Sequence, residues 1–164
     1  MEVTVAKTAG FCFGVKRAVE QVYEQAEHGG LPVYTYGPII HNDQVVQDLE
    51  ERGVTVLDGK KALLQADKGT VILRSHGVGR AVEAEIEELG FQIVDATCPF
   101  VKKIHRIVER ESRAGAYIII VGNDNHPEVE GIKGWCCGPV SVVENTADFE
   151  NLPDLTGKKV CVVS

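Results

Sequence analysis

The chain has 164 residues, of which 44% are hydrophobic and 25% are charged. That is enough to bury one ordinary core or two small ones, and no segment has the composition of a disordered region. A formal net charge of -7 disfavours nucleic-acid binding, because a phosphate backbone is bound by a local excess of Lys and Arg. The longest apolar run, residues 116–121, is far shorter than the roughly 20 residues of a membrane span. Met1 leads into a strand pattern rather than a signal peptide. We therefore expect a cytoplasmic protein that binds neither nucleic acid nor membrane.

Short apolar runs alternate with helical patterns along the chain. The runs expected as strands are residues 3–6, 33–36, 54–57, 71–73, 92–94, 117–121, 141–143 and 160–163. Apolar residues recur at helical spacing in residues 15–27, 42–52, 80–89 and 99–113. This alternation predicts an α/β protein with largely parallel sheets.

Two stretches of the sequence repeat the same order of features. Cys12 is followed by a helical pattern, Gly29, a strand pattern and His41, and Cys98 is followed by the same order ending at His126. The two cysteines are 86 positions apart and the two histidines 85. The repeat predicts two similar small parallel-sheet α/β units, residues 1–96 and 97–164.

The last strand pattern runs toward a turn that the first unit has and the second lacks. In the first unit a strand leads to the segment RSHG at 74–77, whereas the pattern at 160–163 is followed only by Ser164. We therefore expect the second unit to be incomplete at its C-terminal end, in a chain that is a fragment of a longer protein.

The residues that could carry chemistry follow strands and precede helices. In parallel α/β sheets, ligands bind beyond the carboxyl ends of the strands, where loops and helix N-termini converge. Cys12 and Cys98 stand at such positions, where a helix N-terminus favours the metal-binding thiolate. His41, His76 and His126 occupy three further loops, and together they predict a phosphate or oxyanion pocket.

For the remaining candidates a purely structural role has to be considered. Glu128 is either a first-turn helix acid or, two residues after His126, the best-placed carboxylate for proton transfer. His28 and His105 fall on helices and are expected to be ordinary surface or core histidines. Free cysteines are commonly buried small hydrophobes, and this is the reading for the other three, Cys136, Cys137 and Cys161.

Five cysteines, an odd number, do not make a disulfide framework, and a reducing cytosol leaves them as thiols or metal ligands. No C-x-x-C, H-E-x-x-H, P-loop or G-x-G-x-x-G motif is present. Two cysteines alone cannot close a metal site, because zinc and iron-sulfur centres take three or four protein ligands. The repeat indicates that a further ligand would come from a third unit.

Five segments resemble the 4-hydroxy-3-methylbut-2-enyl diphosphate reductase family, in the N-terminal part of its sequence. They are AGFCFGVKRA at 9–18, GPIIHN at 37–42, RSHGV at 74–78, DATCP at 95–99 and NHPEVEG at 125–131. The resemblance implies a trefoil of three similar α/β units around a central 4Fe-4S cluster. It also implies an iron-sulfur oxidoreductase of the last step of the non-mevalonate pathway of isoprene biosynthesis. That reaction reductively dehydroxylates (E)-4-hydroxy-3-methylbut-2-enyl diphosphate to isopentenyl and dimethylallyl diphosphate.

The resemblance also assigns roles to residues. By it, Cys12 and Cys98 are two of three cluster ligands, and the third cysteine is expected beyond residue 164. His41, His76 and His126 bind the diphosphate, and Glu128 delivers protons, with His126 as its catalytic relay. The electron donor is a ferredoxin or flavodoxin type carrier. The 164 residues alone are then expected to be inactive, because one cluster ligand is missing.

Two other classes of function stay open at this stage. The first is a non-catalytic metal- or anion-binding α/β module that uses the cysteines and histidines structurally, with zinc in place of a cluster. The second is a folding unit whose partner is the remainder of its own protein, exposing an apolar edge near residues 160–163. Iron, sulfide and zinc analysis after anaerobic purification separates the first from the enzyme.

Overall fold

The computed structural model describes residues 2–28 and 30–164; Met1 and Gly29, the glycine of the repeat, lie outside the described residues. The helices are α1 (Phe13–His28), α2 (Asp43–Glu51), α3 (Gly59–Gln65), α4 (Arg80–Glu88), α5 (Pro99–Arg113) and α6 (Pro127–Lys133), with a 3-10 helix η1 (Thr146–Asn151). The strands are β1 (Val33–Tyr36), β2 (Thr55–Leu57), β3 (Thr70–Leu73), β4 (Gln92–Asp95), β5 (Tyr117–Val121), β6 (Val140–Val143) and β7 (Val160–Val163).

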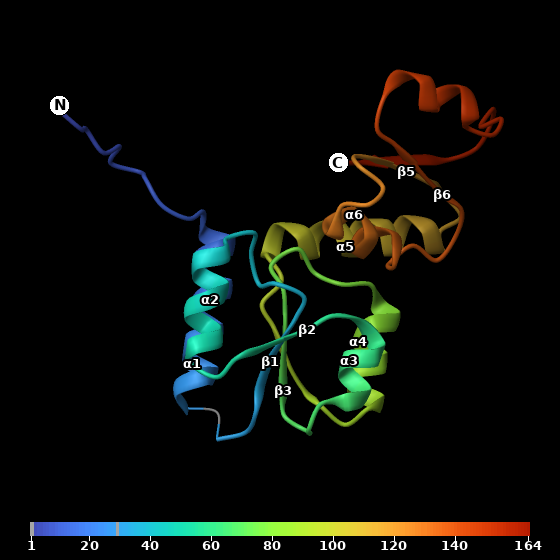
Figure 1. The fold of residues 1–164 in the computed structure, drawn as a ribbon. Coiled ribbons are helices and arrows are strands. Elements are labelled where there is room, and N and C mark those ends of the chain that lie inside the picture. Colours follow the sequence, from blue (N-terminus) through green and yellow to red (C-terminus); the bar gives the residue numbers. More distant parts are fainter. Residues whose placement is uncertain (1, 29) are drawn as a thin grey trace.

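The strands form two separate parallel sheets (Figure 1). The first has the order β2-β1-β3-β4 and the second the order β6-β5-β7. In the first sheet β1 lies between β2 and β3, and in the second sheet β5 lies between β6 and β7. Every pairing is parallel. The predicted fold class, α/β with two parallel sheets, is confirmed.

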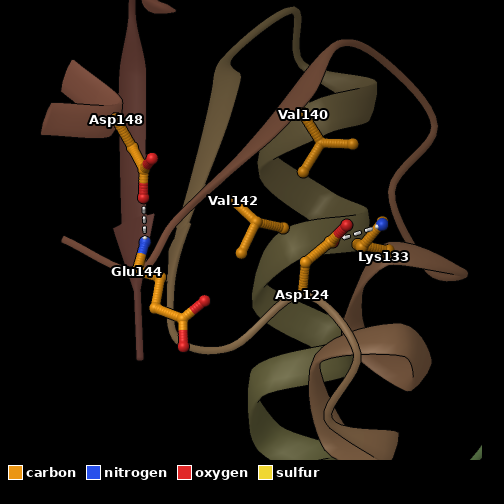
Figure 2. A pocket seen from close by; sticks show the side chains of 6 residues that line it. All are labelled: Asp124, Lys133, Val140, Val142, Glu144 and Asp148. Carbon is orange, nitrogen blue, oxygen red and sulfur yellow. Dashed lines mark hydrogen bonds and ion pairs between the residues drawn. The ribbon is translucent and has the colours of Figure 1, made fainter. Parts of the chain in front are cut away.

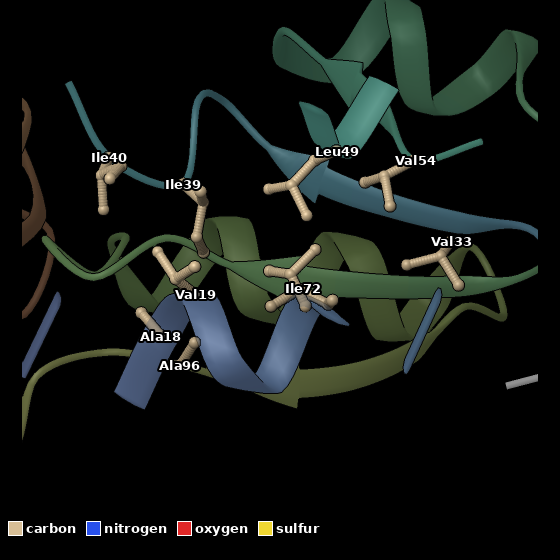
Figure 3. Packing of buried hydrophobic residues seen from close by; sticks show 10 residues of the cluster. Ala18, Val19, Val33, Ile39, Ile40, Leu49, Val54, Ile72 and Ala96 are labelled. Atoms are coloured by element: carbon tan, nitrogen blue, oxygen red, sulfur yellow. The ribbon is translucent and has the colours of Figure 1, made fainter. Parts of the chain in front are cut away.

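The first sheet is covered by helices on both faces. Alternate side chains of β3 point to opposite faces, so Ile72 packs with Val19 of α1 and Leu49 of α2 (Figure 3). Its neighbours Val71 and Leu73 pack on the other face, where α3 and α4 supply Leu63 and Ile86. Burial on both faces explains why these strands read as continuous apolar runs in the sequence.

The second sheet packs one face against α5 and α6. Val108 of α5 and Ile132 of α6 are buried against Ile118 and Ile120 of β5. The opposite face is less covered, and Val162 of β7 is 59% exposed. α5 lies between the two sheets, so its N-terminal end reaches the strand ends of the first sheet (Figure 1).

One predicted strand is wrong. Residues 3–6 have no regular structure, and the N-terminal segment extends away from the body of the molecule (Figure 1). Val3 and Val5, which are 78% and 74% exposed, have strand propensity but no partner strand among the described residues. The other seven strands form within a residue or two of their expected bounds, while no helical range was predicted for α3, α6 or η1. Within the described residues, no helix has the length and apolar character that crossing a membrane requires.

Candidate functional site

Both candidate cysteines stand at helix N-termini. Cys12 directly precedes α1, and its carbonyl accepts the first-turn hydrogen bond from the Lys16 amide at 2.9 Å. Cys98 is the residue before Pro99, the first residue of α5. Cys12 is exposed and Cys98 is half-buried. Both sulfurs therefore lie where the first backbone N–H groups of a helix have no partner within the helix.

The two helix starts come together at Gly14, which Cys98 contacts. Gly14 is buried, and a β-carbon placed on it would lie 2.6 Å from the Cys98 sulfur. The Cys98 sulfur therefore packs against a residue that is only two positions after Cys12 in the sequence. Arg17 of α1 reinforces this approach, because its guanidinium donates to the carbonyl oxygens of Thr97 at 3.3 Å and Asp95 at 3.5 Å.

Ser75 connects three of the loops that carry candidate residues. Its amide and its hydroxyl both donate to the Ile39 carbonyl, at 3.4 and 3.3 Å, in the loop before His41. Its own carbonyl accepts from the Cys98 amide at 2.9 Å. Ser75 is 5% exposed, and buried polar groups of this kind are normally hydrogen-bonded. The His41, His76 and Cys98 loops are therefore held at one end of the first sheet.

The three predicted histidines lie together. The ring centroids of His41 and His76 are 4.9 Å apart, those of His76 and His126 5.7 Å, and those of His41 and His126 6.4 Å. His41 and His76 follow strands of the first sheet, whereas His126 follows a strand of the second and precedes α6. The structure thus brings the three imidazoles together, and their sharing of one functional site stays a prediction.

His76 is the most enclosed of the three. Burial, and then the neighbouring His41, Arg74 and His126, lower its pKa to about 4, so the ring is neutral at pH 7. Its Nδ1 is buried and has no hydrogen-bond partner among the described residues. A buried polar atom without a partner is costly. Such an atom, on a ring that lies beside two further imidazoles, fits a site that a polar ligand completes.

Two cavities adjoin the histidines. One, of about 260 Å³, is lined by Phe11, Val15, His41, Ser75 and His76 among others, so it extends from the Cys12 segment to the histidine pair. The other, of about 300 Å³, contains His126 and the half-buried Glu128. The Glu128 amide donates to His126 Nδ1 at 3.2 Å, which makes His126 the N-cap of α6.

A third cavity, of about 390 Å³, lies apart from these residues against β6 (Figure 2). Val140 and Val142 form its apolar wall, and a Lys133–Asp124 ion pair and two further acids border it. Its six lining residues include no cysteine or histidine.

The remaining histidines and cysteines follow their structural reading in all but one case. His28 is exposed on α1 and His105 is 4% exposed on α5. Cys136 and Cys161 are half-buried against the second core. Cys137 was expected to be buried and is exposed instead. Its backbone amide binds the Ser112 hydroxyl in the turn after α6, which leaves the side chain outside the core.

Known proteins match the chain along its whole length. The family described as "LytB protein" matches residues 3–164. The chain belongs to the LytB family. The 4-hydroxy-3-methylbut-2-enyl diphosphate reductase of Caldanaerobacter subterraneus subsp. tengcongensis is 47% identical to it over 167 residues, and that of Geotalea uraniireducens is 50% identical over 166.

Solved structures of LytB relatives share the fold. A structure titled as (E)-4-hydroxy-3-methyl-but-2-enyl diphosphate reductase, the terminal enzyme of the non-mevalonate pathway, matches with a TM-score of 0.82 and 40% identity over 98% of this chain. The Plasmodium falciparum E-1-hydroxy-2-methyl-but-2-enyl-4-diphosphate reductase matches with a TM-score of 0.89 and 32% identity over 96% of this chain. This LytB chain spans 57% and 56% of the two curated relatives and 56% and 49% of the two solved chains.

The thiols of this LytB chain fit part of an iron-sulfur site. Cys98 Sγ packs on the backbone of Gly14, at the start of the helix that follows Cys12, so two sulfur donors stand at neighbouring helix N-termini. Over residues 2–28 and 30–164, no three His, Cys, Asp or Glu side chains are arranged to hold a metal ion. The chain thus offers two of the three or four protein ligands that a cluster takes.

Sequence reasoning missed three residues that shape the LytB site. Ser75 acts through its hydrogen bonds, and Gly14 acts because it has no side chain. Neither property produces a periodic pattern of apolar residues in the sequence. Arg74 lies beside the histidines, with its guanidinium against Gly37 and its Nε donating to the Gly77 carbonyl at 3.5 Å. The available sign of their importance was that Gly14 lies in the segment GFCFG, and Arg74 and Ser75 lie in the segment RSHG.

Proposed function

We propose that the protein to which these residues belong reductively dehydroxylates (E)-4-hydroxy-3-methylbut-2-enyl diphosphate. The allylic C–O bond breaks, two electrons and two protons are taken up, one water leaves, and isopentenyl or dimethylallyl diphosphate forms. The observation that carries the proposal is the gathering of three imidazoles from three loops, 4.9 to 6.4 Å apart, beside the two cysteine-bearing helix starts. Family membership and the names of the relatives support it.

The histidines bind the diphosphate in this proposal. His41 and His126 are exposed to the site, and His76 offers a buried ring nitrogen without a partner. A bound diphosphate accepts hydrogen bonds from these rings. Fixing the diphosphate in this way holds the allylic carbon in one orientation, and orientation is a large contribution to catalysis.

Glu128 and His126 handle the protons. Glu128 lies in the first turn of α6, two residues after His126, and lines the same cavity. A carboxyl group at hydrogen-bonding distance from a substrate hydroxyl is a suitable general acid. In the proposal Glu128 protonates the leaving hydroxyl, directly or through the His126 ring.

Cys12 and Cys98 would hold the 4Fe-4S cluster with a third cysteine from outside these residues. When bound, the cluster supplies the two electrons and an open iron that acts as a Lewis acid. A ferredoxin or flavodoxin type carrier would feed it. The boundary between two units at residues 96 and 97 stays a prediction, and so does a third unit.

Two experiments test the proposal. In the first, isothermal titration calorimetry of the 164-residue chain with inorganic pyrophosphate should give one site, which is lost in His41→Ala and kept in His28→Ala, a matched histidine outside the site. In the second, the chain is completed with the C-terminal part of the Caldanaerobacter relative, reconstituted anaerobically and assayed with substrate and reduced ferredoxin. Zinc in place of iron and sulfide, with no turnover, would favour the non-catalytic module.

A further inference from the structure

A line of glycines joins the first sheet to α6. A β-carbon on Gly134 would lie 2.5 Å from the Gly79 α-carbon, so the two backbones touch directly. A β-carbon on Gly131 of α6 would be 3.5 Å from the Gly77 carbonyl oxygen. Gly77 directly follows His76, and Gly131 lies one turn and a half along the helix from His126. We call the contact of these four glycines the glycine seam.

His105 of α5 fills the seam. A β-carbon on Gly77 would lie 2.7 Å from its Cε1, and one on Gly131 would lie 3.5 Å from its Nε2. The same imaginary atom on Gly77 would be 2.9 Å from the Thr97 methyl group, beside Cys98. The imidazole therefore contacts the loop of His76, and it also contacts the helix that begins at His126. His105 is the side chain that recurs among the nearest neighbours of both Gly77 and Gly131.

Trp135 holds the imidazole in place from the far side. The two rings stack with centroids 5.4 Å apart and an angle of 18° between their planes. The indole Nε1 donates to the Val78 carbonyl at 2.8 Å, which attaches the turn after α6 to the loop of the first sheet. Arg80 lies over the outer face of the indole, 4.9 Å from its centroid, and pairs with Glu109 of α5. The ring of His105 is thus packed between Trp135 and the glycines of the seam.

The imidazole forms no hydrogen bond through its buried nitrogen. His105 Nε2 has no partner among the described residues, and burial lowers the pKa of the ring to about 4, so it is neutral at pH 7. Its contribution in this position is its shape, because the Cε1–Nε2 edge of the ring packs against both Gly77 and Gly131.

We propose that His105 is a positioning residue that sets the distance of His126 from the His41–His76 pair. His41 and His76 are already tied together through Ser75, whereas His126 arrives on the second sheet and reaches them across the glycine seam. The proposal deepens the proposed function and rests on it, because it assumes that the three imidazoles act on one diphosphate. Groups that support a site from behind are commonly needed for its geometry.

The test measures the coupling between His76 and His126 in the 164-residue chain. NMR titration gives the pKa of His76 in the wild type, His126→Ala, His105→Ala and the double variant, a double-mutant cycle. Because the His126 charge lowers the pKa of His76, His126→Ala should raise it in the wild-type background. With His105→Ala present, the effect of His126→Ala should fall by about half or more. Strict additivity of the two changes would overturn the proposal.

Pyrophosphate affinity gives a second readout. His105→Ala should weaken binding roughly tenfold, the order of loss seen when supporting groups behind a site are removed. Val108→Ala is the matched control, since Val108 is fully buried on the same helix but faces the second core. It should lose stability by a similar amount and keep both the His76 pKa and the affinity. Equal effects of the two substitutions would reduce His105 to ordinary core packing.

A second variant covers the case in which His105→Ala does not fold. Gly134→Ala pushes the seam apart at its other end and leaves the imidazole intact, so it should weaken the His76–His126 coupling in the same direction. Unchanged coupling in this variant would contradict the proposal. If the wild type binds no pyrophosphate but the coupling still depends on His105, the positioning role holds and the proposed function fails.

Discussion

The sulfur of Cys98 rests on the backbone of Gly14, and only hydrogen at that α-carbon leaves room for it. Gly14 has ordinary helical geometry, so the absence of a side chain rather than backbone freedom explains the residue. Two helices that are far apart in the sequence can therefore start side by side.

Gly14→Ala should displace the Cys98 sulfur, because its β-carbon would lie 2.6 Å away. Overpacking of this kind costs about 1–3 kcal/mol, and the better helix propensity of alanine returns only about 1 kcal/mol. Alkylation followed by peptide mass spectrometry should show Cys98 labelling roughly twofold faster or more as the thiol becomes exposed. Gly138→Ala is the control, since its β-carbon makes an ordinary 3.5 Å contact. Identical labelling in both variants would rule out the displacement.

The stability of the fold should fall as the pH is lowered from 6.5 toward 4. Burial lowers the pKa of His76 and of His105 to about 4, so the unfolded chain takes up protons over this range and the folded chain does not. Each such histidine contributes a slope of up to about 1.4 kcal/mol per pH unit. Urea unfolding at several pH values should show this slope, and His105→Gln should make it shallower. A slope that the substitution leaves unaltered would mean that His105 titrates normally.

The 164 residues alone should not hold a 4Fe-4S cluster. Cys12 and Cys98 are two donors where three or four are needed, and the described residues contain no other group arranged to bind a metal. Anaerobic incubation with iron and sulfide should leave a spectrum like that of the Cys98→Ser variant. A stable 4Fe-4S absorption band together with reductase activity would refute this.

Asp148 should hold only its local turn. Its carboxylate accepts from the Glu144 amide at 2.8 Å and the Asn145 amide at 3.0 Å, at the edge of the cavity in Figure 2. These bonds lower the pKa of Asp148. In Asp148→Ala, hydrogen exchange at the two amides should accelerate while exchange in β5 stays the same. Faster exchange in β5 as well would show that η1 supports the second core.

The sequence predicted best what depends on periodic burial. Seven strands and four helices leave apolar patterns because they bury whole faces, and the two sheets follow from them. The 3–6 segment has the same composition as a strand, but pairing needs a neighbour, which composition does not specify. α3 was missed because it is short, with Leu63 alone fully buried on it.

His41 and His126 were predicted because the repeat placed them at equivalent strand ends, and His76 because it also follows a strand. The contacts behind it were not predicted. His105 was expected to be an ordinary surface or core histidine. The residues next to it in the sequence do not indicate that its ring contacts both Gly77 and Gly131. A contact between three distant segments has no spacing rule, and only the three-dimensional arrangement reveals it.

The Ser75 hydrogen bonds have a mechanical consequence. They fix the His41 loop, the His76 loop and the start of α5 to one another. Because α5 also packs Val108 into the core of the second sheet, the same bonds help to hold the sheet that carries His126 and Glu128 against the first.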